Sequence, residues 1–392
     1  MIIDGFAGEL IAPGDEEYDR TRRVWNAAFD RFPALIARAR GTADVAAVIR
    51  YARERGLPLS VRSSGHSAAG LAVADDALML DLSGMKAVAV DPAARTATAA
   101  AGLTWAELDA ATQARGLAVT GAALGSVGIA GMTLGGGIGR LDRLAGLSCD
   151  NLTAAEVVTA DGSILRASAA ENPDLLWALR GGGGNFGVVT SLTYRLHPVT
   201  TAWGGILGYT FDHAAEVLQA YAHASEHAPD TLALYAALRT APPLPFILER
   251  LHGQPAAALL AFCFGTADEH PERAVAAVRA LLPPPAADAT GPMTYLGTQR
   301  MGEGIAPEGM HHGETAEWLR LLDDTAIKAL VSAAAEATSP QSAIKALVTA
   351  AAEATSPRSA ISIKGMGGAT ARVPAGQTAG PPRPRDGAGR SA

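Results

Sequence analysis

The spacing of apolar positions between residues 42 and 101 predicts one helix followed by short strands. Apolar side chains recur every three or four residues from Thr42, taken as the capping residue, to Gly56, which predicts an amphipathic helix. Alternating or continuous short apolar runs follow it. The predicted strands are Leu57–Arg62, Leu78–Leu82, Ala87–Val90 and Thr96–Ala101.

Turn and capping residues extend this α+β pattern to about residue 200. Thr104 and Glu107 have the spacing of a capping box, which predicts a helix that stops at Gly116. Asp161-Gly162 suits the positive φ angles of a tight turn and predicts a hairpin of strands 156–160 and 163–167. Two further elements are predicted, a helix beginning at Asn172-Pro173 and a strand over Val188–Leu196.

From Phe211 onward the pattern predicts a second domain, in which helices cover an antiparallel sheet. Its predicted elements are helices Ala214–Glu226 and Pro271–Leu282 and strands Thr231–Leu238 and Ala258–Gly265. We therefore expect domains over residues 1–200 and 201–375. Residues 376–392 are expected to be a disordered tail, because Pro, Gly and Arg dominate there without apolar periodicity.

A tandem duplication lies within residues 326–359. Ala326–Ser342 is followed by Ala343–Ser359, and the copies differ only at Ser332/Thr349 and Gln341/Arg358. Repeat arrays need about three or more copies to be stable. The duplication is therefore interpreted as a local insertion in preference to a functional repeat.

Composition indicates a globular protein with a small-molecule partner. The chain has 392 residues, 48% of them hydrophobic, and a formal net charge of -7, which argues against a nucleic-acid or anionic membrane surface. Its cysteines, Cys149 and Cys263, are too few for a disulfide framework. With no signal segment or transmembrane span visible, a cytoplasmic location is expected. His311-His312 is open to metal binding, but a solvated loop is favoured and no metal is expected.

Three glycine-containing segments predict a groove for a long anionic cofactor, because glycine lets a backbone approach a ligand closely. They are Val61–Ser67, Gly135–Gly139 and Gly181–Gly187. Gly182, Gly184 and Gly187 match the dinucleotide spacing, but they follow a helix and precede a strand, the reverse of the Rossmann order. The sequence also lacks a P-loop and a GxSxG elbow.

His66 follows Arg-Ser-Ser-Gly and admits several roles from its position alone. They are general base, metal ligand, covalent anchor and structural turn residue. Arg62 either supplies charge near a phosphate or is solvated at a strand end.

These residues resemble the berberine-bridge-enzyme-like FAD-linked oxidases, which have the vanillyl-alcohol-oxidase (PCMH-type) FAD domain. The resemblance runs from about Tyr18 to about Val199. The motifs that carry it are Val61–Ser67, Gly128–Gly139, Gly146–Leu152 and Trp177–Thr190, together with Pro13–Asp15 and Val24–Asn26.

The resemblance implies a two-part PCMH-type FAD-binding domain and a second substrate domain of antiparallel sheet covered by helices. It implies that the His66 imidazole is bonded to the 8α carbon of the flavin. The implied FAD site comprises His66, Arg62, Ser63, Ser64, Gly65, Ser67, Gly128, Gly131, Thr133, Gly135, Gly136, Gly139, Gly187 and Val189.

Some positions depart from the family pattern. Leu124 stands where some members attach the flavin a second time through cysteine, so one covalent bond is expected and Cys149 is expected to be a small apolar residue. Arg140 replaces a frequent aromatic residue and Ser64 a frequent glycine. Gly367–Val373 still fits, but the likeness ends near Gly376, from which a truncated substrate domain is expected.

The resemblance implies an oxidase that passes hydride from a small organic substrate to flavin N5 and uses O₂, giving H₂O₂. An alcohol, sugar, alkaloid or phenol is equally compatible as substrate. A catalytically silent flavin-binding protein and a dehydrogenase with another acceptor remain alternatives. No catalytic base is assigned; the residues considered in the second domain are Tyr209, Tyr235, Tyr295 and His252.

Overall fold

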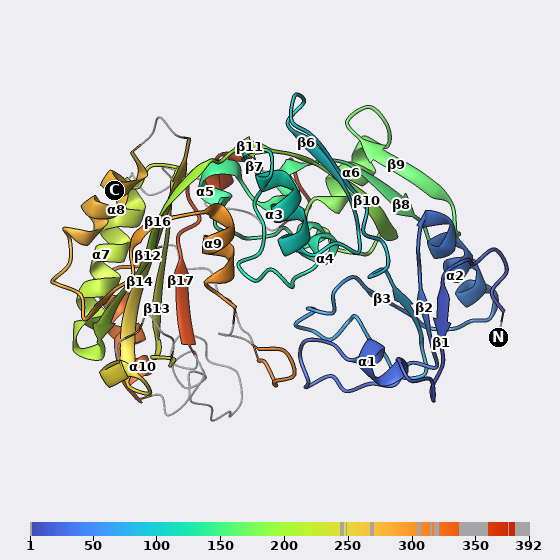
Figure 1. The fold of residues 1–392 in the computed structure, drawn as a ribbon, viewed down its shortest axis with the longest axis horizontal. Helices are drawn as coiled ribbons and strands as arrows, with labels where there is room; N and C mark the ends of the chain where they lie inside the picture. The colour runs from blue at the N-terminus through green and yellow to red at the C-terminus, as the bar shows by residue number, and fades with distance from the viewer. Residues whose placement is uncertain are drawn as a thin grey trace. The chain divides into compact units, whose positions relative to one another are not determined.

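The computed structural model describes most of the chain as two compact units (Figure 1). The described residues are 2–243, 247, 249–266, 270–303, 307–313, 316, 321–336, 360–374 and 376–380. Unit 1 is the chain up to Pro198 with the described parts of Gln299–Glu314 and Val373–Arg383, and unit 2 is the remainder. The second copy of the duplication, Ala343–Ser359, and residues 381–392 lie outside the described residues.

Unit 1 begins with a four-stranded mixed sheet in the order β1-β2-β4-β3. β2, β4 and β3 are parallel, and β1 is antiparallel to β2. Helix α2 (Thr42–Glu54) buries Val45 and Val48 completely in the core that this sheet shares. The bounds are β1 Glu9–Ile11, α1 Tyr18–Arg22, β2 Leu35–Arg38, β3 Leu59–Arg62 and β4 Leu78–Asp81.

The second sheet of unit 1 is antiparallel, in the order β5-β6-β10-β8-β9. The predicted Asp161-Gly162 hairpin is confirmed, with Gly162 at φ +83° and the Thr159 N–H donating to the Ser163 carbonyl at 2.9 Å. The strands are β5 Val88–Asp91, β6 Thr96–Ala100, β8 Leu152–Val158, β9 Ile164–Ser168 and β10 Val188–Arg195, and a two-stranded sheet pairs β7 Leu117–Ala118 with β11 His197–Pro198.

Helices α3 and α6 begin where the local signals place them. The Thr104 N–H donates to the Glu107 carboxylate at 2.7 Å, as the capping box predicts, and Pro173 occupies the first turn of its helix. The bounds are α3 Trp105–Gln113, α4 Ile129–Leu134, α5 Asp142–Ala145 and α6 Pro173–Leu179.

Thr42 does not cap α2, contrary to the prediction. Gly41 is the N-cap, and the Thr42 hydroxyl bonds instead to the Glu156 carboxylate on β8. Thr190 on β10 donates to the same carboxylate oxygen at 2.8 Å. The hydroxyl therefore fixes the start of the helix to the antiparallel sheet, a long-range contact that local sequence does not encode.

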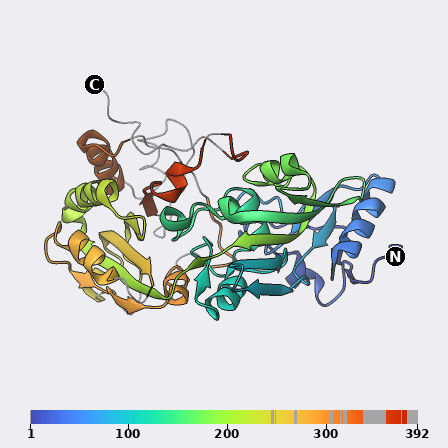
Figure 2. The ribbon, with the colours of Figure 1, turned by 90° about the horizontal axis from the view of Figure 1, so that it is seen from above.

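Unit 2 is a six-stranded antiparallel sheet whose main path is β15-β12-β14-β13-β17, with β16 paired to β12. Figures 1 and 2 show α7 and α8 on one face of this sheet, and their apolar side chains share a core with alternate strand residues. The strands are β12 Thr201–Thr210, β13 Leu232–Thr240, β14 Pro255–Gly265, β15 Ala287–Asp288, β16 Gly291–Met293 and β17 Ala360–Lys364. The helices are α7 Ala214–His227, α8 Pro271–Arg279, α9 Tyr295–Arg300, α10 Asp324–Glu336 and α12 Ala369–Arg372.

Strand β12 was not predicted from sequence. Gly204, Gly205 and Gly208 interrupt its apolar alternation, and glycine lowers strand propensity. The structure explains two of them, because a Cβ at Gly204 would lie 2.1 Å from the Ala261 carbonyl oxygen and one at Gly205 would lie 2.0 Å from the Ala289 oxygen. Both sides of β12 are thus packed closely against neighbouring backbone.

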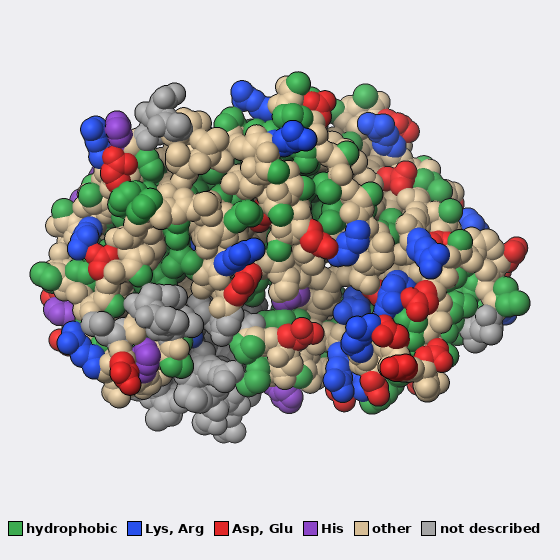
Figure 3. Space-filling view, in the orientation of Figure 1, with side chains coloured by type: hydrophobic (Ala, Val, Ile, Leu, Met, Phe, Trp, Pro, Cys, Tyr) green, Lys and Arg blue, Asp and Glu red, His purple; other side chains and the backbone are tan. Residues whose placement is uncertain are grey.

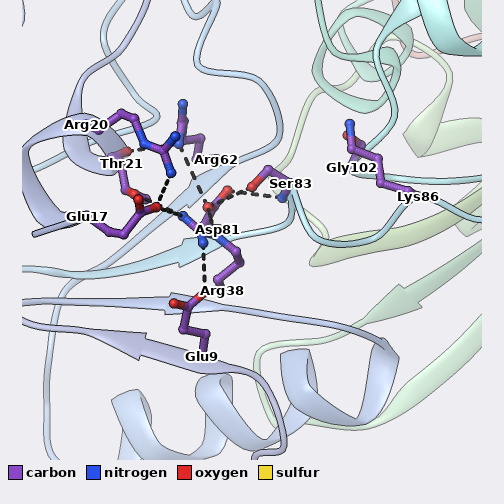
Figure 4. A network of polar contacts seen from close by, with 10 residues as sticks. All are labelled: Glu9, Glu17, Arg20, Thr21, Arg38, Arg62, Asp81, Ser83, Lys86 and Gly102. Atoms are coloured by element: carbon purple, nitrogen blue, oxygen red, sulfur yellow. Dashed lines mark hydrogen bonds and ion pairs between the residues drawn. The ribbon is translucent and has the colours of Figure 1, made fainter.

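A buried carboxylate ties the three parallel strands together at their carboxyl ends. Asp81 ends β4, its side chain is fully buried, and it pairs in register with Arg38 of β2 and Arg62 of β3. Arg38 Nε donates to Asp81 Oδ2 at 3.1 Å, and Arg62 Nη1 lies 3.8 Å from that oxygen. Ser83 adds bonds from its N–H and hydroxyl (Figure 4).

Replacing Asp81 by Asn should destabilise unit 1 strongly. The variant leaves two guanidinium groups without their buried counter-charge, and breaking a buried pair costs about 3–5 kcal/mol. Urea unfolding of Asp81→Asn measures the loss. Glu9→Gln is the matched control, because Glu9 bonds Arg38 at 2.7 Å from a half-exposed position and should cost less than about 1 kcal/mol. Equal losses in both variants would contradict this account.

Candidate functional site

A groove of about 920 Å³ runs through unit 1, near the upper end of the ~300–1,000 Å³ typical of small-molecule and cofactor sites. Its walls come from β3, the turn Ser63–Ser67, helix α4 and the segment Gly183–Val189. The turn follows the carboxyl end of parallel strand β3, the edge at which open α/β sheets usually bind ligands. Three segments that the sequence singled out therefore meet in one cavity.

The turn that carries His66 is held by its two serines. Ser63 Oγ donates to the Ala101 carbonyl at 2.7 Å, and Ser64 Oγ accepts the Gly128 N–H at 2.6 Å. Gly65 has φ +83°, a left-handed conformation that favours glycine. The serine hydroxyls thus fix the loop to the end of β6 and the start of α4.

The glycines on the groove wall divide into tightly packed and open positions. A Cβ at Gly128 would lie 2.5 Å from Ser63 Oγ, and one at Gly187 would lie 2.5 Å from the Val158 carbonyl oxygen. At Gly131 and Gly184, by contrast, a Cβ would meet no protein atom within 4 Å. The groove therefore exposes bare backbone, a surface suited to close approach by a long cofactor.

Ten of the fourteen residues expected to bind FAD line this groove. They are Ser63, Ser64, Gly65, His66, Ser67, Gly128, Gly131, Gly135, Gly187 and Val189. Four do not line it, namely Arg62, Thr133, Gly136 and Gly139.

Each of those four residues has a different place in the packing. Arg62 Nη1 donates to the Thr21 carbonyl at 2.9 Å beside Asp81, and the buried Thr133 hydroxyl bonds the Tyr194 hydroxyl at 2.8 Å. Gly136 accepts the Cys149 N–H at 2.9 Å, and a Cβ at Gly139 would lie 2.1 Å from the Gly121 oxygen. These residues make packing or hydrogen-bond contacts without lining the groove. A sequence motif does not distinguish such residues from those that line it.

His66 is half-buried at the groove, with partners that sequence reasoning missed. Its Nε2 lies 3.0 Å from Ser126 Oγ, and its ring stacks on Trp25 with centroids 5.0 Å apart and an interplanar angle of 23°. Burial, with a smaller contribution from the charge of His312, lowers the pKa of His66 to about 4. The ring is therefore neutral at physiological pH.

Neither Leu124 nor Cys149 lines the groove. Leu124 begins the turn before α4, where its carbonyl accepts the Val127 N–H at 3.2 Å. Cys149 is a buried thiol whose Sγ lies 3.7 Å from Asp150 Oδ1. In the described ranges, no group of three or more His, Cys, Asp or Glu side chains is arranged to hold a metal ion.

The residues considered as bases differ in their surroundings within unit 2. Tyr209 lies in the core beneath the helices, where burial raises its pKa to about 12, and Tyr295 is buried edge-on to Phe264. His252 Nε2 bonds the Ile247 carbonyl at 2.9 Å. Tyr235 is half-buried on β13 with the Lys364 ammonium 5.0 Å from its ring centre.

Comparison with known proteins shows what this segment of the chain is similar to. The model of the FAD binding domain matches residues 33–168. The matched segment is about a third of the chain. This segment contains the His66 turn and helix α4, and the chain is similar to berberine-bridge-enzyme-like FAD-linked oxidoreductases.

Individual relatives extend the similarity beyond this domain. The (R)-6-hydroxynicotine oxidase of Paenarthrobacter nicotinovorans is 39% identical over 190 residues, which cover 48% of this chain and 42% of that protein. The crystal structure of 6-hydroxy-D-nicotine oxidase from Arthrobacter nicotinovorans superposes with a TM-score of 0.74 at 27% identity, over 86% of this chain and 73% of that one. A BBE-like protein of Physcomitrella patens shares the fold, with a TM-score of 0.70 at 22% identity over 83% and 72% of the chains. The chain thus spans less than half of the first relative's length.

The surface of the protein carries charges of both signs. On the face drawn in Figure 3, Lys and Arg side chains lie beside Asp and Glu side chains. Within the part of the chain that the structure describes, no helix combines the length and apolar character needed to cross a bilayer.

His66 should make the apoprotein more sensitive to acid. Its pKa is about 4 in the folded state and 6.5 in the unfolded state, so only the unfolded chain gains this proton as pH falls from 6.5 towards 4. Folding stability is consequently lost over that range. Urea unfolding at pH 7 and pH 5 should show a smaller loss in His66→Gln than in the unsubstituted protein, and an equal loss would refute the lowered pKa.

Two glycine substitutions should separate flavin binding from folding. Gly131→Ala adds a methyl group that meets no protein atom on the groove wall, so it should weaken FAD binding without lowering the melting temperature. Gly128→Ala places its methyl group against two serine hydroxyls and should cost about 1–3 kcal/mol of stability. Equilibrium dialysis with FAD and thermal unfolding measure the two effects. A destabilised Gly131→Ala protein with unchanged FAD affinity would reverse this assignment.

Proposed function

We propose that this protein is an FAD-dependent oxidase that binds its flavin covalently through His66 and oxidises a small organic substrate with O₂. The observation that carries the proposal is the position of a neutral, oriented histidine on the wall of the cofactor-sized groove in the FAD binding domain. Unit 2 would provide the substrate domain.

The lining residues support FAD as the cofactor. Open backbone at Gly131 and Gly184 allows close approach, and N–H groups of the Ser63–Ser67 turn are donors available for an anionic pyrophosphate. The apolar side chains of Ile49, Leu57 and Leu59 line the groove as well and suit an aromatic base. When bound, the flavin supplies a two-electron acceptor at N5.

His66 is suited to covalent attachment by its protonation state and its hydrogen bond. A neutral imidazole is a nucleophile, whereas imidazolium is not. Ser126 engages Nε2 at 3.0 Å, which leaves Nδ1 as the nitrogen for the flavin and lets the serine oxygen accept the Nε2 proton. Leu124 offers no second nucleophile, so a single covalent bond is proposed.

The reaction is proposed by analogy with relatives named as oxidases. Substrate hydride would pass to the flavin, a side chain would take the accompanying proton, and O₂ would leave as H₂O₂. No base is assigned among the residues considered. An alcohol, sugar, alkaloid or phenol remains possible as substrate.

Acid precipitation tests the covalent link directly. Yellow colour should stay with the pellet of the purified protein and should be released from His66→Ala, which retains the glycine groove. Colour released from both proteins would refute attachment through His66.

A substrate panel with an H₂O₂ readout tests the oxidase activity separately. Flavin bleaching by a substrate together with stoichiometric peroxide is the expected result. Bleaching without peroxide would identify a dehydrogenase, and the absence of bleaching by any substrate would favour a catalytically silent flavin-binding protein.

A further inference from the structure

Three aromatic rings are stacked beside the groove, those of His66, Trp25 and His312. The Trp25 ring stacks on both His66 and His312, with ring centroids 5.0 Å and 3.7 Å away and interplanar angles of 23° and 10°. The indole is almost completely buried, at 7% exposure. Both imidazoles therefore stack on one rigid plane.

Backbone and side-chain hydrogen bonds hold this stack together. The backbone N–H of Trp25 donates to the Gly65 carbonyl at 3.1 Å, which fixes the backbone of residue 25 to the His66 turn. On the other side, the Gly309 N–H donates to the Trp25 carbonyl at 3.0 Å. Asn26 pairs with the backbone of His312 through both its amide nitrogen and its amide oxygen, at 2.8 Å and 3.0 Å. The segment 307–313 is thus clamped to residues 25–27.

His312 is itself oriented by a hydrogen bond of its ring. Its Nε2 lies 3.0 Å from the Pro307 carbonyl oxygen, so a protonated or Nε2–H ring is favoured there. Burial is the main cause of the lowered His66 pKa, and a positive charge on His312 lowers it further. The other groups close to the His66 turn are the neutral Ser126 hydroxyl and the Arg62 guanidinium, whose Nε would lie 3.3 Å from a Cβ at Gly65.

We propose that Trp25 and His312 are positioning residues for flavin attachment: the indole sets the plane of the His66 ring, and His312 holds the indole in place. This rests on the proposed covalent function of His66. It assigns a role to one histidine of the His311-His312 pair, for which the sequence favoured a solvated loop. His311 is exposed.

The chemistry of covalent flavin attachment sets the requirements on the His66 ring. One C–H bond of the flavin 8α-methyl group and the imidazole N–H are exchanged for a C–N bond. The two hydrogens, with two electrons, are taken up by O₂ as H₂O₂. The nucleophilic nitrogen must be unprotonated and aligned with the methyl carbon, and a misplacement of about 1 Å can cost about 100-fold in rate.

The test measures covalent attachment and total flavin binding separately. Apoprotein is mixed with FAD in air, acid-stable flavin is followed with time, and total bound flavin is measured by ultrafiltration. His312→Ala and Trp25→Leu should slow the appearance of acid-stable flavin by roughly 10- to 100-fold, while total binding changes less than about twofold. Trp25→Phe keeps a ring and should restore most of the rate.

His311→Phe is the matched control, and His312→Phe separates stacking from charge. The control should behave as the unsubstituted protein. In apoprotein labelled at histidine, NMR titration should show a higher midpoint for His66 in His312→Phe, because the ring is retained and the charge is removed. The proposal is overturned if the attachment rate and the His66 midpoint are both unchanged in the His312 variants.

A failure of the proposed function gives a different pattern. If the unsubstituted protein never forms acid-stable flavin, covalent attachment is refuted. The NMR titration midpoint and the ring chemical shifts of His66 in the Trp25 and His312 variants still decide whether the stack orients the His66 ring.

Discussion

The groove depends on one buried carboxylate. Asp81 lies between Arg38 and Arg62 at the carboxyl ends of three parallel strands, and Arg62 is the last residue before the turn that carries His66. A fully buried anion between two cations has little freedom to move, because each displacement leaves a charge uncompensated. The ends of the three strands are thereby held in register, and the turn after β3 has a fixed starting point at the edge of the sheet.

The glycines on this cavity have two different roles, since some allow close packing and others leave the backbone open. At Gly128 and Gly187 a side chain would collide with the protein itself, whereas at Gly131 and Gly184 it would project into unoccupied space. The first pair brings the walls together and the second leaves room for a ligand. A single motif therefore serves both folding and binding, and sequence alone does not separate the two uses.

Local signals in the sequence predicted most of unit 1. The Thr104 capping box, the Asp161-Gly162 turn and Pro173 each act within a few residues, and the structure confirms them. Strand β12 was missed because its glycines are explained only by the neighbouring strands. Ten site residues line the groove as motif matching placed them. Arg62 does not line it, because Asp81 and the Thr21 carbonyl draw its side chain away from the cavity.

The partners of His66 could not be predicted because they come from distant parts of the chain. Ser126 is 60 residues away from His66, and no local pattern marks Trp25 or His312 as neighbours. The contact between Asn26 and His312 joins residues 286 positions apart. During synthesis, the residues that line the groove, which end at Val189, leave the ribosome before residue 312 does. The surroundings of His66 are consequently completed only after the segment 307–313 has been made.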